Sequence, residues 1–210
     1  MSIASRISTF NRTRKWHLFL SQVKPTAQMT ILDVGYTERE FSPMDNFIEK
    51  HYPYPDKITA LGISRCDAFA ARYPKVKTLA YDGKLFPFPD KSFDVCWSNA
   101  VLEHVGDTQK QLGFLKEIVR VSKRAFITTP NRLFPVEIHT RTPLLHWLPK
   151  SMFDRYLRAT GKSWAAGNYM HLLTEKGLQR LLVDSGAQRY RLVKNALAGF
   201  TLDFAVMIEC

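Results

Sequence analysis

The chain has 210 residues, of which 45% are hydrophobic and 23% charged, as expected for a single folded domain spanning residues 1–210. No apolar run approaches the ~18 residues of a membrane-spanning helix, and no secretory signal is recognisable, so we expect a cytoplasmic protein. The three cysteines, Cys66, Cys96 and Cys210, are too widely spaced for a disulfide framework or a cysteine-based zinc site, and we expect no metal site.

The net charge of +11 is concentrated in two stretches. Residues 1–32 carry five basic and no acidic side chains, and residues 120–162 carry nine basic and two acidic ones. A local excess of this kind favours an anionic partner: a phosphorylated substrate, a nucleic acid or an acidic membrane surface. The simpler alternative is a well-solvated basic surface.

The N-terminal region, residues 1–28, is expected to contain a basic amphipathic helix over residues 3–20. Ile3, Ile7 and Phe10 recur at helical spacing, and basic side chains lie between and after them. Such a helix either covers one edge of a core or lies on a membrane surface, so peripheral membrane contact through residues 3–20 stays open.

Strands alternate with helices through residue 130. Helices are expected near residues 44–50, at 65–73 and at 108–121, the last N-capped by Asp107. Strands are predicted at residues 30–35, 57–63, 76–80, 93–97 and 124–129. This alternation is typical of a doubly wound, mainly parallel sheet with helices on both faces.

Residues 130–171 interrupt that pattern. They are rich in proline, histidine, tryptophan and arginine, which predicts an insertion of short helices and loops after the fifth strand. A helix capped by Thr174 and ended by Gly186 follows. Two strands at about 188–194 and 201–208 lie close enough in sequence to form an antiparallel pair at the sheet edge.

Three short segments carry a recognisable signature: YDG at residues 81–83, LFPFPDKSFDV at 85–95 and VLEHV at 101–105. They resemble the class I S-adenosylmethionine-dependent methyltransferases, in the branch with the LPFPD-SFDV and VLEHV motifs. The resemblance extends over about residues 29–208. It implies an α/β, Rossmann-like fold with a seven-stranded, mainly parallel sheet of order 3-2-1-4-5-7-6, strand 7 being antiparallel. It also implies an enzyme whose cofactor is S-adenosylmethionine.

The resemblance further implies a cofactor site at the ends of the first four strands. Asp33 would support the methionine end, Gly35 would permit close backbone approach, and Asp82 would face the adenine amino group. Either Phe86 or Leu85 would cover the adenine ring. The residues expected to bind the cofactor are Asp33, Gly35, Tyr36, Gly62, Ile63, Asp82, Gly83, Ser98 and Asn99.

Two departures from the family pattern bear on that site. The family's glycine-rich loop is reduced to GYTER at residues 35–39, and Gly62 stands where the family usually has an acidic residue that binds the ribose. Glu38 or the Ser64 hydroxyl would have to compensate. The expected outcomes are weaker cofactor binding, a rearranged loop or loss of binding. The last of these leaves a non-catalytic binding or scaffold protein as the alternative function.

The insertion is where this fold places acceptor contacts. The expected catalytic residues are His139, which is favoured as general base, with His104 and Glu137 as the other candidates. Arg132 and Arg141 are expected to clamp a phosphate or carboxylate, and Trp147 and His171 to contact the acceptor. The basic bias of the insertion favours a small anionic acceptor, such as a phosphorylated, nucleotide-linked or lipid-linked sugar. RNA is less favoured because no RNA-binding module is visible.

Overall fold

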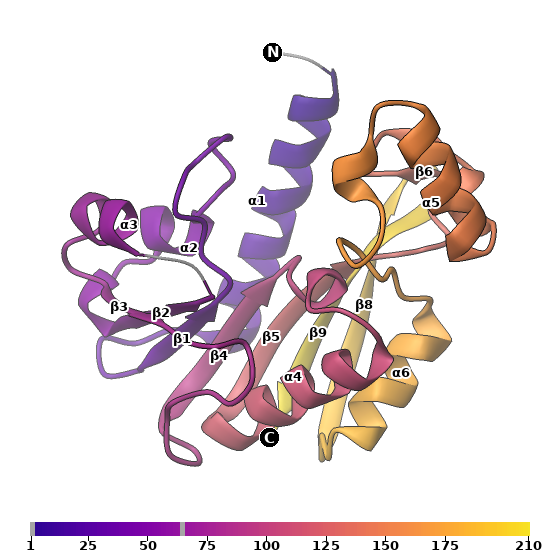
Figure 1. Cartoon of the computed structure of the whole chain (residues 1–210). Helices are drawn as coiled ribbons and strands as arrows, with labels where there is room; N and C mark the ends of the chain where they lie inside the picture. Colours follow the sequence, from indigo (N-terminus) through magenta and orange to yellow (C-terminus); the bar gives the residue numbers. More distant parts are fainter. Residues whose placement is uncertain (1–2, 64–65) are drawn as a thin grey trace.

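The computed structural model describes residues 3–63 and 66–210 (Figure 1). Its central sheet has the order β3-β2-β1-β4-β5-β9-β8, in which β9 runs antiparallel to both of its neighbours. The predicted order is confirmed, because β8 and β9 are the sixth and seventh strands of this sheet. The strands are β1 (Ile31–Val34), β2 (Ile58–Gly62), β3 (Lys77–Ala80), β4 (Phe93–Asn99), β5 (Ser122–Pro130), β8 (Arg189–Leu197) and β9 (Phe200–Glu209).

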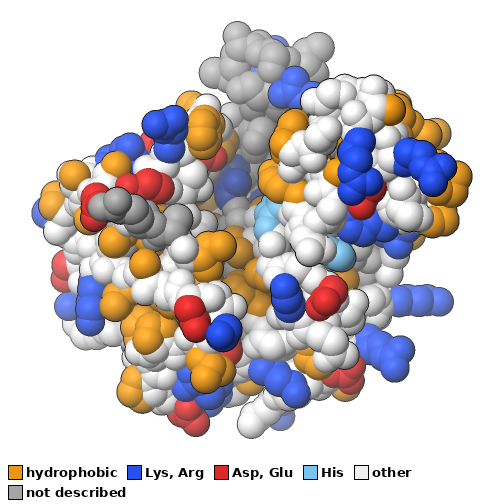
Figure 2. Space-filling model, viewed as in Figure 1, with side chains coloured by type: hydrophobic (Ala, Val, Ile, Leu, Met, Phe, Trp, Pro, Cys, Tyr) orange, Lys and Arg blue, Asp and Glu red, His pale blue; other side chains and the backbone are white. Residues whose placement is uncertain are grey.

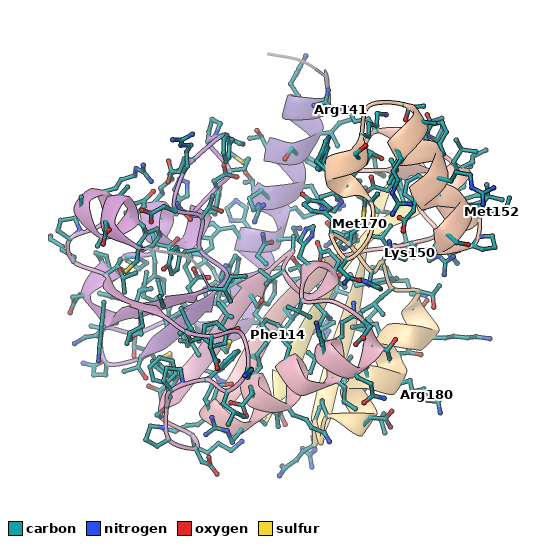
Figure 3. The ribbon with its side chains drawn as sticks, in the orientation of Figure 1. Phe114, Arg141, Lys150, Met152, Met170 and Arg180 are labelled. Atoms are coloured by element: carbon teal, nitrogen blue, oxygen red, sulfur yellow. The ribbon has the colours of Figure 1, made fainter. Side chains whose placement is uncertain are left out.

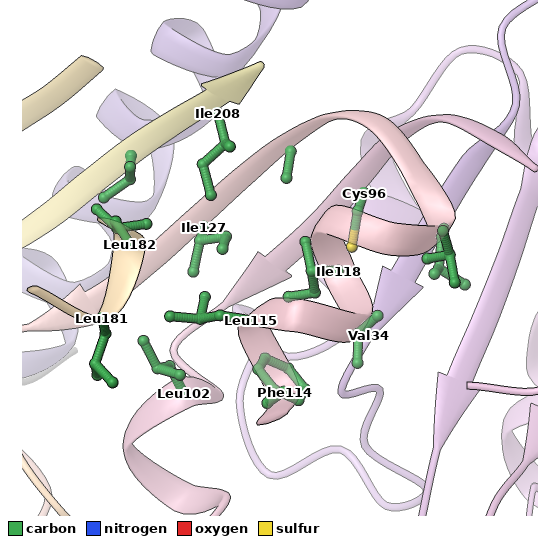
Figure 4. Close-up of a cluster of buried hydrophobic side chains, with 14 of the residues drawn as sticks. Val34, Cys96, Leu102, Phe114, Leu115, Ile118, Ile127, Leu181, Leu182 and Ile208 are labelled. Atoms are coloured by element: carbon green, nitrogen blue, oxygen red, sulfur yellow. The ribbon is translucent and has the colours of Figure 1, made fainter. Parts of the chain in front are cut away.

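Helices cover both faces of the sheet, as the buried β1 requires. On one face, α4 (Thr108–Val121) and α6 (Glu175–Asp184) pack over the apolar cluster of Figure 4. On the other face lie α1 (Ile3–Val23), α2 (Phe47–His51) and α3 (Asp67–Arg72). Both predicted N-caps are confirmed: Asp107 accepts from the Lys110 amide at 3.0 Å, and Thr174 accepts from the Gly177 amide at 3.2 Å.

The first helix is longer and less two-sided than predicted. Trp16 and Phe19 pack into the core, which confirms that the helix covers the sheet, but Lys15 is buried on the same helix and pairs with Asp203 at 3.0 Å. The expected separation of basic and apolar faces is therefore wrong. No described helix is long and apolar enough to cross a bilayer.

The insertion begins directly after β5 and has a small core of its own. Its elements are the hairpin β6 (Val136–Glu137) and β7 (Thr142–Pro143), α5 (Lys150–Ala159), and the 3-10 turns η3 (Leu145–Trp147) and η4 (Ser163–Ala165). Phe153, Leu157, Ala165 and Met170 are packed together inside it. Two further 3-10 turns lie in the main domain, η1 (Pro55–Lys57) before β2 and η2 (Leu102–His104) after β4.

Candidate active site

A cavity of about 570 Å³ lies at the carboxyl ends of β1 to β4, where ligands bind in open α/β sheets. Six of the nine residues expected to bind the cofactor are in its wall: Gly35, Tyr36, Gly62, Ile63, Asp82 and Gly83. Figure 2 shows the hollow between the first half of the sheet and the insertion, with histidine surface at its edge.

Gly35 leaves β1 in a conformation that only glycine adopts without strain. Its φ is +109°, and a Cβ built there would lie 2.3 Å from Cγ2 of Val101. Its amide donates to the carbonyl of Leu61 at 2.9 Å, which fixes the turn against β2. Both the backbone conformation and the packing of Val101 therefore require glycine at position 35.

Tyr36 explains the second departure from the family pattern. A Cβ on Gly62 would lie 2.6 Å from Cε1 of Tyr36, so the tyrosine ring occupies the space that a side chain at position 62 would need. The ring packs against Phe69 with centroids 4.4 Å apart. Burial raises the pKa of the Tyr36 hydroxyl, and the neighbouring Cys66 thiol adds to the shift. Tyr36 therefore leaves room only for glycine at position 62.

The expected compensation by Glu38 is wrong. Its carboxylate accepts from the amides of Ala68 at 2.8 Å and Phe69 at 3.3 Å, at the first turn of α3. Ser64, the other candidate, lies outside the described residues.

Asp33, Ser98 and Asn99 do not line the main cavity. Ser98 is fully buried and donates to the carbonyl of Val34 at 3.3 Å, and Asn99 accepts from the Thr128 hydroxyl at 2.8 Å. Asp33 faces Glu49 beside a much smaller neighbouring cavity. Burial, reinforced by the Glu49 charge, raises the pKa of Asp33 well above its ordinary value.

Asp82 is in the wall of the main cavity with a 65% exposed side chain, and it accepts from the Lys84 amide at 3.0 Å. The expectation that Phe86 covers the adenine is wrong, because Phe86 is a core residue whose amide donates to Glu117 at 2.7 Å. Leu85 is 71% exposed. Phe114 of α4 (Figure 3) is in the wall together with Tyr36 and Tyr81, and the sequence predicted no role for it.

Two of the candidate catalytic histidines meet at the acceptor side of this cavity. His104 is in the wall, and its ring stands edge-on to that of His139 with centroids 4.9 Å apart. Nδ1 of His139 lies 2.7 Å from Oε1 of Glu137. The amide and hydroxyl of Thr140 both donate to the other oxygen of Glu137, each at 2.6 Å. The structure thus brings His104 beside the Glu137–His139 pair, which lies on a separate segment of the chain.

A family model described as a methyltransferase domain matches residues 52–125, which contain β2, β3 and β4 with the loops that line the cavity. The match covers 74 of the 210 residues. Together with the fold, it supports an S-adenosylmethionine-dependent methyltransferase and leaves the acceptor open.

Solved structures share the fold of this methyltransferase at low identity. An S-adenosylmethionine-dependent methyltransferase from Methanosarcina mazei is 20% identical, with a TM-score of 0.55 over 90% of this chain and 96% of that one. One from Aquifex aeolicus is 16% identical, with a TM-score of 0.53 over 94% and 97%. One from Mesorhizobium loti is 14% identical, with a TM-score of 0.57 over 87% and 91%. No curated protein sequence matches the chain.

The main cavity of the methyltransferase fits this cofactor. Its volume is in the range of small-molecule sites, and Asp82 is the one carboxylate among the described residues of the wall. The role of Asp82 as acceptor for an adenine amino group stays a prediction. When bound, S-adenosylmethionine supplies a methyl group on a positively charged sulfonium.

The ion pair between Glu137 and His139 makes the stability of the methyltransferase depend on pH. Burial opposes both charges, but the hydrogen bond and charge of each partner outweigh it, so the pKa of Glu137 falls from 4.5 to about 2 and that of His139 rises above 6.5. The contribution of Glu137 to the free energy of unfolding is complete above pH 4.5 and is lost as the pH falls towards 2. The contribution of His139 is complete below pH 6.5 and is lost as the pH rises through its raised pKa.

We therefore expect His139→Asn to destabilise the protein most between about pH 4.5 and 6.5. Urea unfolding of wild type and variant at pH 5.5 and at pH 9 measures this difference. The loss of unfolding free energy should be larger at pH 5.5. An equal loss at the two pH values would mean that the two side chains are not charged partners.

A second cavity of about 400 Å³ lies within the insertion and against α4. Arg132, His146, Lys150 and His171 are in its wall, so two of the four predicted acceptor contacts, Arg132 and His171, come together there. The structure does not bring Arg141 or Trp147 into this wall. Both are exposed on the insertion, and Arg141 is labelled there in Figure 3.

Proposed function

We propose that this methyltransferase transfers the methyl group to an oxygen of a small anionic acceptor. The observation that carries the proposal is the buried Glu137–His139 pair, which reaches the cofactor cavity through His104. Methyl transfer to a hydroxyl requires loss of its proton, and an imidazole held by a carboxylate is suited to that task. In the simplest arrangement, Nδ1–H of His139 donates to Glu137 and Nε2 takes the proton.

The charge of the second cavity supports an anionic acceptor. Lys150 is paired with Asp154 at 2.9 Å. Among the described residues, Arg132 donates to the carbonyls of Trp147 and Leu148, at 3.5 and 3.3 Å, and to no carboxylate. Those two contacts leave most of the guanidinium's donors for a ligand. A phosphate or carboxylate held by Arg132 would place the rest of a small acceptor on the insertion side of the site.

We expect Arg132→Gln to raise KM for an anionic acceptor roughly tenfold or more while leaving KM for its neutral counterpart nearly unchanged, because a charged hydrogen bond contributes about 1.5–3 kcal/mol. The measurement uses methyl-labelled S-adenosylmethionine and a panel of sugar phosphates and nucleotide-linked sugars, each beside its dephosphorylated form.

Arg180→Gln is the matched control, since the Arg180 side chain is 86% exposed on α6 (Figure 3). It should change neither KM. Preferred methylation of the neutral members of the panel, or equal effects of the two substitutions, would contradict an anionic acceptor held by Arg132.

A further inference from the structure

Glu103 is a buried carboxylate with one oxygen left unpaired. It lies in η2, directly after β4, and its side chain is 0% exposed. Oε2 accepts from the Thr129 hydroxyl at 3.0 Å, whereas Oε1 has no hydrogen-bond partner among the described residues. A buried carboxylate oxygen without a partner is costly, so its presence calls for a ligand that is bound from outside the chain.

Two imidazoles lie close to the Glu103 carboxylate. Nε2 of His104 lies 3.9 Å from Oε1 of Glu103, too far for a hydrogen bond. One ligand atom from each of Glu103, His104 and His139 lies within 4.8 Å of the other two. The three side chains therefore converge on one point without bonding to one another.

The other nitrogen of each imidazole is already engaged. Nδ1 of His104 lies 2.7 Å from the carbonyl of Tyr169, and Nδ1 of His139 lies 2.7 Å from Glu137. A carbonyl and a carboxylate only accept, so each Nδ1 carries the proton and each Nε2 keeps a free lone pair when the ring is neutral. Histidines that bind metals are held in this way, by a carboxylate or a backbone carbonyl on the second nitrogen.

We propose that Glu103, His104 and His139 bind one divalent transition-metal ion at the acceptor end of the cofactor cavity. Ligand atoms about 2.1 Å from one metal are roughly 3 to 4.2 Å apart. The 3.9 Å between Glu103 and His104 already meets that spacing. The other ligand atoms lie within 4.8 Å of one another, and a small side-chain rotation would bring them to it. Two imidazoles and one carboxylate favour zinc, iron, cobalt or nickel over magnesium or calcium.

The position of the site suggests what the ion does. Three protein ligands leave coordination positions open, and His104 also belongs to the wall of the cofactor cavity. An acceptor hydroxyl that occupies an open position loses its proton to solvent more readily, because the cation stabilises the anion that remains. His139 then acts as a ligand instead of taking the proton itself. This role rests on the proposed function, whereas binding of the ion does not.

Metal binding is measured directly on untagged, metal-stripped protein. Titration with Co²⁺, followed by visible absorption, and with Zn²⁺, followed by calorimetry, should each show one ion per chain. Glu103→Gln and His139→Asn should each lower the affinity roughly 100-fold or more, and Glu137→Gln by roughly 10- to 100-fold through the orientation of His139. Circular dichroism and thermal unfolding confirm that each variant is folded.

His17→Asn is the control, because His17 is an exposed residue of α1 remote from the site. It should bind both metals like the wild type. Binding below one ion per chain in the wild type, or equal affinities in the His139→Asn and His17→Asn variants, would overturn the metal site.

Activity separates this inference from the proposed function. Loss of methyl transfer on chelation and its return with Zn²⁺ or Co²⁺ would support the role of the ion. Full transfer in the presence of a chelator, without stoichiometric binding, would overturn the metal site and leave the proposed function standing. Stoichiometric binding without transfer to any acceptor would overturn the proposed function alone.

Discussion

Gly62→Asp is expected to lower the affinity for S-adenosylmethionine at least tenfold, although it restores the residue type that the family usually has there. The added Cβ would lie 2.6 Å from the ring of Tyr36, and the ring is held from its other side by Phe69. Overpacking of this kind costs about 1–3 kcal/mol and would displace the ring of Tyr36. Because Tyr36 lines the cofactor cavity, the displaced ring should obstruct it.

The double substitution Tyr36→Ala/Gly62→Asp should bind the cofactor more tightly than the wild type, by roughly 10- to 100-fold, since a charged hydrogen bond to the ribose contributes about 1.5–3 kcal/mol. Calorimetry on the wild type, both single variants and the double variant measures the coupling between the two positions. Tyr36→Ala alone should bring no such gain. Equal affinities of Gly62→Asp and the double variant would show that Tyr36 does not block position 62.

Lys15→Ala is expected to lower the unfolding free energy by about 3–5 kcal/mol, because it leaves the buried carboxylate of Asp203 without its cation. The two side chains are 7% and 5% exposed, and the ion pair joins α1 to β9. Burial lowers the pKa of Lys15 although Asp203 opposes that shift, so the ammonium depends on its partner to stay charged.

Urea unfolding of Lys15→Ala beside Lys123→Ala tests this expectation. Lys123 pairs with Asp94 at a similar distance, 2.8 Å, but its side chain is 62% exposed. That exposed pair should contribute no more than about 1 kcal/mol. Equal losses in the two variants would mean that the Lys15–Asp203 pair is not protected from water.

The sequence predicted the scaffold well where local patterns decide the structure. The helix at Thr108–Val121 has the predicted bounds because Asp107 caps it and its apolar residues recur along one face. The strand order came from the family resemblance and not from local pattern. The first helix was misjudged because Lys15 is buried through a partner on β9, and nothing near Lys15 in the sequence indicates that partner.

The site was predicted only in part because its key contacts join distant segments. Gly62 was interpreted as the loss of a ribose-binding residue, and only the fold shows that the Tyr36 ring fills the space beside it. Phe86 was predicted to cover the adenine ring, but its amide donates to the Glu117 carboxylate, which holds it in the core. Glu103 belongs to the VLEHV signature. Only the fold shows that one of its carboxylate oxygens has no hydrogen-bond partner among the described residues and that His104 and His139 lie near the carboxylate.

The most direct test of the cofactor site is calorimetry of the wild-type protein with S-adenosylmethionine and S-adenosylhomocysteine. The cavity at the ends of β1 to β4 predicts one molecule per chain, with a dissociation constant in roughly the micromolar range. The predicted contact between the Asp82 carboxylate and the adenine amino group implies a loss of affinity of about tenfold or more in Asp82→Ala. Unchanged affinity in Asp82→Ala would refute the placement of the adenine. No binding of either ligand at millimolar concentration would contradict the assignment of this cavity as a cofactor site.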